Sequence, residues 1–153
     1  MAELPEQRTC GVNVFKDDSA NAFALPGGKI GVHTGLLDIA ENQDQLATVS
    51  GHEVAHVLAS HANERVSTSY VASTGLQLAQ VAAGEPTAAK QQLFGLLGLG
   101  AQVGVLLPFS RTQESEADLL GLDLMAKAGF DPRAALPLWG NIGQAGPGNP
   151  PEF

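Results

Sequence analysis

Five consecutive residues about one third of the way along the chain carry the side chains best suited to chemistry. They read His52-Glu53-Val54-Ala55-His56. Two histidines four residues apart lie about one turn from each other on one face of a helix, so a single zinc ion can bind both imidazoles. The glutamate after the first histidine can reach water bound to the same ion. The alternative is an exposed helix with two solvated histidines, since so short a pattern also arises by chance.

A catalytic zinc usually has three protein ligands, so a third ligand must come from elsewhere in the chain. The candidates lie on a second predicted helix and are Glu114, Glu116 and Asp118. Glu114 and Asp118 share a helix face, whereas Glu116 points elsewhere. One carboxylate of this pair could bind the metal while the other accepts a hydrogen bond from a ligating imidazole. The same acids could also form a solvated first helical turn, which the helix dipole favours. Charge pattern alone leaves both interpretations open.

The composition is that of a globular chain with room for one core. It has 153 residues, of which 44% are hydrophobic and 16% charged. The net charge is −8 and there is no basic run to neutralise phosphates, which argues against a nucleic-acid partner. The single cysteine excludes an internal disulfide, and the first ten residues lack the apolar core of a signal peptide.

Three short strands are predicted before the histidine motif. Alternating or apolar runs place them at 12–15, 21–25 and 29–33. We expect a small antiparallel sheet whose exposed edge could pair with an extended peptide. A purely structural meander is equally compatible with the pattern.

The helix that carries the two histidines has a clear start. Asn42 with Gln45 three residues later resembles a capping box, so the helix is expected to run from about Gln43 to Val66. A second capping box at Ser110 predicts the start of the acidic helix. That helix is expected to end before Gly129, and Asp131-Pro132 to begin the last one.

Between these helices the chain is apolar and rich in small residues. Gly84-Glu85-Pro86 divides it into two expected helices, an antiparallel hairpin. Residues 91–110 carry no charge, a length that could just span a bilayer. Several glycines and glutamines favour instead a hairpin that packs on the domain or covers the active-site cleft. A peripheral membrane contact stays open.

Longer patterns extend the match to a known family. Glu114-x-x-x-Asp118 follows the second histidine by 58 residues, within a segment that begins Ser110-Arg111 and ends Glu116-Ala117-Asp118. With Asn21-Ala22-Phe23-Ala24-Leu25-Pro26-Gly27-Gly28 and Ala128-Gly129-Phe130-Asp131-Pro132, the chain resembles the HtpX/CAAX-prenyl-protease family of gluzincin zinc metallopeptidases over residues 12–140. The absence of convincing transmembrane helices suggests its short, soluble, periplasmic bacterial branch.

The resemblance implies a fold, a cofactor and a role for each residue. The fold is α+β and mainly helical, with a small antiparallel three-stranded sheet packed on about five helices and a zincin-like active-site helix. The cofactor is Zn²⁺, with His52, His56 and Glu114 as ligands. Glu53 is the general base, and Asp118 orients a ligating histidine.

The implied function is that of a zinc-dependent metalloendopeptidase acting on unfolded or misfolded envelope proteins, in the periplasm or cell envelope, where its relatives serve protein quality control. Glu53 would activate the zinc-bound water. An extended substrate would lie along Asn21, Ala22, Phe23 and Ala24. The partner is a polypeptide, and no oligomeric state is predicted.

Residues 1–153 are expected to form a single catalytic domain that is truncated at the C-terminus. Members of this branch carry a later Ser-Thr-His-Pro segment whose histidine lies near the active site. Here the chain stops at Pro151-Glu152-Phe153, where that segment would begin.

Two further interpretations remain at this stage. One is a zinc-bearing, chaperone-like binding module or an inactive truncated peptidase. The other is a structural zinc site, which needs a fourth ligand from His33, His61, Cys10 or another carboxylate, none at a persuasive spacing.

Overall fold

The computed structural model describes residues 11–144. The chain divides into two compact units: Ser60–Ser115 forms one, and the segments on either side of it form the other. Among the described residues the structure is mainly helical, with six α-helices and one three-stranded sheet, as the predicted α+β class requires.

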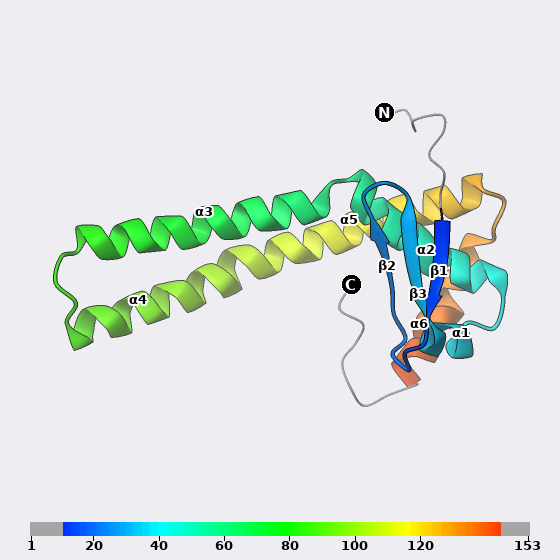
Figure 1. Ribbon diagram of the computed structural model, residues 1–153, viewed down its shortest axis with the longest axis horizontal. Coiled ribbons are helices and arrows are strands. Elements are labelled where there is room, and N and C mark those ends of the chain that lie inside the picture. Colours follow the sequence, from blue (N-terminus) through cyan, green and yellow to red (C-terminus); the bar gives the residue numbers. More distant parts are fainter. Residues whose placement is uncertain (1–10, 145–153) are drawn as a thin grey trace. The chain divides into compact units, whose positions relative to one another are not determined.

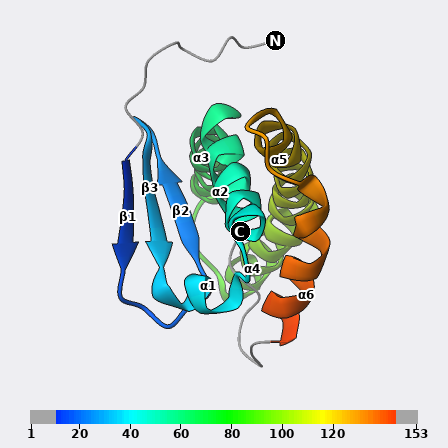
Figure 2. The same ribbon diagram turned by 90° about the vertical axis from the view of Figure 1, so that its right-hand side faces the viewer.

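The three strands lie close to their predicted positions, at β1 (Gly11–Phe15), β2 (Ala22–Leu25) and β3 (Lys29–His33). Their order is β1-β3-β2 (Figure 2). β2 and β3 form an antiparallel pair, joined by a turn in which Gly27 and Gly28 have φ of 103° and 83°. Positive φ is accessible to glycine at little cost, which explains both residues.

The prediction of an all-antiparallel sheet is wrong for β1, which pairs with β3 in parallel. β3 lies between the other two strands, and β1 runs opposite to β2, so β1 pairs with β3 in parallel. In the segment between β1 and β2, the Ser19 hydroxyl contacts both Asp17 Oδ1 at 2.6 Å and His33 Nδ1 at 2.7 Å. The bond from the Ser19 hydroxyl also holds the pKa of the Asp17 carboxyl below its ordinary value.

The unit that contains the sheet also contains α1 (Thr34–Ile39), α2 (Gln43–Leu58), α6 (Ala135–Gln144) and the part of α5 (Leu107–Lys127) that follows Ser115. In Figure 2, α2 lies next to β2. The buried core joins the sheet, α1, α2 and α6 through Ala22, Val32, Leu36, Val49 and Leu138.

The predicted start of α2 is confirmed, but its predicted end is wrong. The Asn42 side chain accepts a hydrogen bond from the Gln45 backbone N–H at 3.0 Å. The helix stops at Leu58 rather than near Val66, because Ser60 adopts a left-handed conformation with φ of 60°. No glycine or proline marks this break in the sequence.

The second unit is a helical hairpin. It consists of α3 (His61–Ala82), α4 (Ala88–Ala101), a π-helical turn at Gln102–Leu106 and the beginning of α5. α3 and α4 lie side by side and antiparallel (Figure 1), joined at Gly84 with φ of 74°, as the sequence predicts. No described helix is long and apolar enough to cross a membrane.

The predicted cap at Ser110 is wrong, whereas the predicted end of α5 is confirmed. Ser110 lies inside a helix that already begins at Leu107. Gly129, with φ of 90°, follows the end of α5, and Asp131 caps the next turn through the Arg133 backbone N–H. Residues 132–134 of that turn form a 3₁₀ helix before α6 begins.

Candidate metal centre

Helix α2 places two imidazoles edge to face on one side. The Nε2 atoms of His52 and His56 lie 3.0 Å apart, and their ring centroids are 4.7 Å apart. Two nitrogens bound tetrahedrally to one zinc ion at its usual distances would lie about 3.3 Å apart, so the separation suits a shared metal. His52 is only 3% exposed, and the site therefore lies partly inside the fold.

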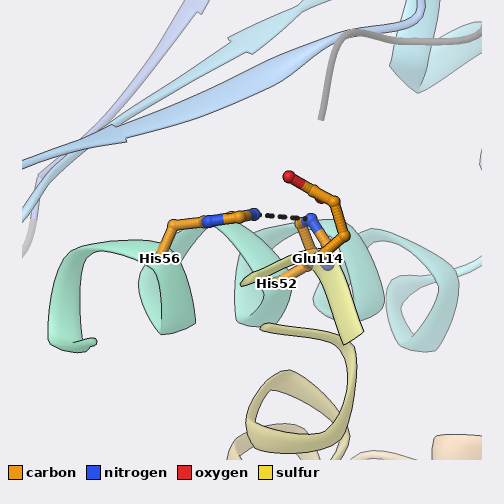
Figure 3. A group of neighbouring side chains, drawn as sticks. All are labelled: His52, His56 and Glu114. Atoms are coloured by element: carbon orange, nitrogen blue, oxygen red, sulfur yellow. Dashed lines mark hydrogen bonds between the residues drawn. The ribbon is translucent and has the colours of Figure 1, made fainter. Parts of the chain in front are cut away.

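Glu114 completes a group of three possible ligands. One ligand atom from each of His52, His56 and Glu114 lies within 4.8 Å of the others. Figure 3 shows the three side chains converging, the histidines from α2 and the glutamate from α5. Two imidazoles and one carboxylate are the donor set of many catalytic zinc sites. The residues present therefore fit a zinc ion with one position left open.

Asp118 fixes the orientation of the first histidine. Its Oδ1 lies 2.9 Å from His52 Nδ1, one helical turn after Glu114. A carboxylate accepts the Nδ1–H, which leaves the lone pair on Nε2, the atom that faces His56. Both members of the predicted acidic pair thus lie at the histidine motif.

Two glycines bring the backbones of α2 and α5 into contact beside His52. A Cβ on Gly121 would lie 2.8 Å from the His52 backbone nitrogen, and one on Gly51 would lie 2.9 Å from the Gly121 oxygen. Real side chains do not tolerate such distances, so only glycine permits this approach. The close crossing sets the distance across which Asp118 reaches His52.

Three contributors to the site are absent from the sequence prediction. Trp139 of α6 stacks edge to face against His52, with ring centroids 6.2 Å apart. Arg65 of α3 donates to Glu114 Oε1 and to Gln113 Oε1. Arginine and glutamine carry no spacing signal for such a role, and the tryptophan gave only a signal for burial. Glu53 is half-buried on α2, and its catalytic role stays a prediction.

The predicted substrate strand is an outer strand of the described sheet. β2 pairs with β3 on one side only and packs against α2 on the helix side. Ala22 is buried and the Asn21 carbonyl accepts from the His33 N–H, whereas Phe23 and Ala24 are half-buried. An outer strand leaves alternate backbone groups unpaired, and these can pair with an extended peptide.

The structure supports a structural metal site with four protein ligands less than a catalytic site with three. Such a site needs a fourth protein ligand, and within residues 11–144 the only group found that could surround an ion is His52, His56 and Glu114. His33 Nδ1 is engaged by the Ser19 hydroxyl, and His61 is buried at the start of α3. Cys10 lies outside the described residues, and so do Pro151, Glu152 and Phe153, where the later histidine segment is expected to begin.

Comparisons with known proteins agree with this geometry. The model of "Peptidase family M48" matches residues 1–151. The chain is 43% identical over 129 residues to "Mitochondrial metalloendopeptidase OMA1" of Schizosaccharomyces pombe, covering 84% of this chain and 36% of that protein. It is 32% identical over 128 residues to "Beta-barrel assembly-enhancing protease" of Escherichia coli strain K12, covering 79% of this chain and 26% of that protein.

The chain therefore spans about a third or less of the length of these relatives. The family match nevertheless covers nearly the whole chain, including every candidate ligand. The names of these two relatives specify a metalloendopeptidase and a protease. On this evidence the chain belongs to peptidase family M48.

Proposed function

We propose that this chain is the catalytic part of a zinc-dependent metalloendopeptidase that cleaves unfolded or misfolded polypeptides. The observation that carries the proposal is the convergence of His52, His56 and Glu114 on one point, with Asp118 orienting His52. When bound there, the zinc ion supplies a Lewis acid that polarises a carbonyl and lowers the pKa of water to about 7.

The protein's own residues then have separate tasks. Glu53 accepts a proton from the attacking water and passes it to the leaving amine. Asp118 keeps the His52 ring in one tautomer and one orientation throughout. The buried position of His52, beside Trp139, limits access of bulk water on that side of the ring.

The substrate class follows from the outer strand. An extended peptide paired with β2 is held through its backbone, so binding depends little on its sequence. Such pairing requires the peptide to be unfolded, because a folded chain has already used those backbone groups. This supports unfolded proteins as substrates, with Asn21, Ala22, Phe23 and Ala24 as the strand that receives them.

The Glu53→Gln variant tests the catalytic role. Glutamine has nearly the same shape but cannot accept the proton, so zinc content should remain while cleavage of unfolded casein falls roughly 10²- to 10⁴-fold. Zinc is measured by mass spectrometry and cleavage by release of acid-soluble peptides. The exposed Leu136→Gln change is the control and should keep full activity.

Retained activity in Glu53→Gln would contradict the assignment of the base. A wild-type chain that binds zinc and unfolded casein but does not cleave would support the alternative, a zinc-bearing binding module. In that case, a longer form of the protein is assayed for cleavage in the same way.

We also propose a compartment and a membrane contact. One group of relatives is named mitochondrial. We favour the bacterial cell envelope, on the strength of the relative named for beta-barrel assembly. The exposed apolar residues of the hairpin favour a peripheral contact with a lipid surface. They include Tyr70, Val81, Leu96, Leu99 and Val103.

A further inference from the structure

Arg65, nine residues after the histidine motif, is bound to the candidate third ligand. Its Nη2 donates to Glu114 Oε1, and its Nε donates to Gln113 Oε1 at 2.8 Å. All three residues belong to the same compact unit, Arg65 in α3 and the other two in α5. One guanidinium thus holds two consecutive residues of α5 at once.

The bond from Arg65 Nε is made to a buried side chain, that of Gln113. Gln113 is only 2% exposed, and its Nε2 donates to Glu64 Oε2 at 3.0 Å and to the His61 carbonyl at 3.4 Å. Its Oε1 accepts from Arg65, so both ends of the amide are engaged. A buried amide with every bond made resists rotation, because any other orientation leaves polar atoms unpaired. Gln113 therefore fixes the Arg65 guanidinium.

The fixed guanidinium in turn restricts the Glu114 carboxylate. Glu114 lies well inside α5, which begins at Leu107, and its side chain is 25% exposed. Without the contact to Arg65, its carboxylate would sample several rotamers. A carboxylate has two oxygens and about four lone-pair positions, so it can accept from Arg65 and still bind a metal. The planar guanidinium of Arg65 can donate to Gln113 and Glu114 at once, whereas the ammonium group of a lysine is a single point charge.

We propose that Arg65 is a positioning residue that holds the Glu114 carboxylate ready for the metal. This inference rests on the proposed function, because it takes Glu114 as a ligand. It adds a specific role for a residue outside the ligand set, and makes Gln113 the anchor of that role. The contact thereby links α3 to Glu114 through side chains alone.

The direction in which zinc affinity changes when Arg65 is removed distinguishes positioning from a simple effect of charge. A positive group near a cation site weakens metal binding through space, so removing it should raise zinc affinity if charge were its only effect. Loss of positioning has the opposite sign. We expect Arg65→Ala to bind zinc roughly 10- to 100-fold more weakly, the usual effect of losing a partner that orients a ligand.

Three variants and the wild-type chain make up the experiment. Zinc affinity is measured by competition with a chromophoric chelator, and the Co²⁺ absorption spectrum reports the ligand geometry directly. Arg65→Lys keeps the charge but cannot hold Gln113 and Glu114 together, so it should also bind more weakly. Arg111→Ala removes a positive charge from the exposed face of the same helix as Glu114 and is the matched control.

The outcomes separate the two proposals. Wild-type affinity, or a higher one, in both Arg65 variants overturns the positioning role while leaving the metal site intact. A wild-type chain that binds no zinc overturns the proposed function itself. Thermal unfolding of the metal-free proteins shows whether Arg65→Ala is folded, and Arg65→Lys carries the test if it is not. An Arg111→Ala protein as impaired as Arg65→Ala also contradicts the proposal.

Discussion

At the scale of single residues, the site depends on how each imidazole is oriented. His52 has Asp118 at 2.9 Å from one ring nitrogen and His56 at 3.0 Å from the other. The first contact decides which nitrogen carries the proton, and so which one has the lone pair that can bind a metal. The sequence places Asp118 one turn after Glu114, which makes a shared role readable from spacing. Arg65 and Gln113 are not readable in this way, because their contact depends on how α3 packs against α5.

We expect Asp118→Ala to lower zinc affinity roughly 10- to 100-fold, since the His52 ring loses its fixed tautomer and orientation. Asp118→Asn should lie between this variant and the wild type, because an amide oxygen can still accept from Nδ1–H. Affinity is measured by chelator competition. Asp123→Ala is the control, an acid on the same helix that pairs with Lys127. Equal affinities in the Asp118 and Asp123 variants would show that the contact does not matter.

At the scale of elements, the structure depends on a close helix crossing. Gly121→Ala would place a methyl group 2.8 Å from the His52 backbone nitrogen and 2.9 Å from its Cα, so the helices must separate. Such overpacking typically costs 1–3 kcal/mol, so we expect the free energy of unfolding to fall by about that amount. Zinc affinity should fall as well, because Asp118 and His52 move apart.

Gly140→Ala is the matched control for the crossing. It lies in α6 with nothing within 4 Å of the added Cβ, so alanine should stabilise its helix by up to about 1 kcal/mol. Urea unfolding of the metal-free proteins measures both changes. If Gly121→Ala is as stable as Gly140→Ala, the close crossing does not constrain the site.

The elements also show how far the sequence predicts this fold. Features with a local cause are confirmed: the Asn42 cap and the glycines at Gly84 and Gly129. Features that depend on packing between elements were predicted wrongly. Ser60 takes a left-handed conformation without a sequence signal, and Ser110 lies inside a helix although it resembles a cap. The parallel pairing of β1 depends on contacts between segments far apart in sequence. The candidate ligands could be proposed from the sequence because two of them share a helix, and the third follows a family pattern.

At the scale of the whole molecule, charge is unevenly distributed along the chain. Between Arg65 and Arg111 the only charged residues are Glu85 and Lys90, although the chain carries a net charge of −8. The structure leaves large apolar side chains exposed over this stretch, such as Leu96 at 62% and Leu99 at 60%. Exposed apolar surface of this extent marks a contact with a protein or a lipid surface.

We therefore expect the chain to bind uncharged phosphatidylcholine vesicles and to lose binding when leucines of the hairpin become polar. Each leucine transferred from water contributes about 1.5–3 kcal/mol, so Leu96→Gln with Leu99→Gln should weaken binding roughly a hundredfold or more. Folding stability should change little, because both side chains are exposed.

Vesicle co-sedimentation measures binding. Leu119→Gln with Leu136→Gln, at positions 72% and 80% exposed, is the control for general hydrophobicity. A wild-type chain that stays in the supernatant contradicts the membrane contact. Equal loss in both double variants shows that the hairpin has no special part in it.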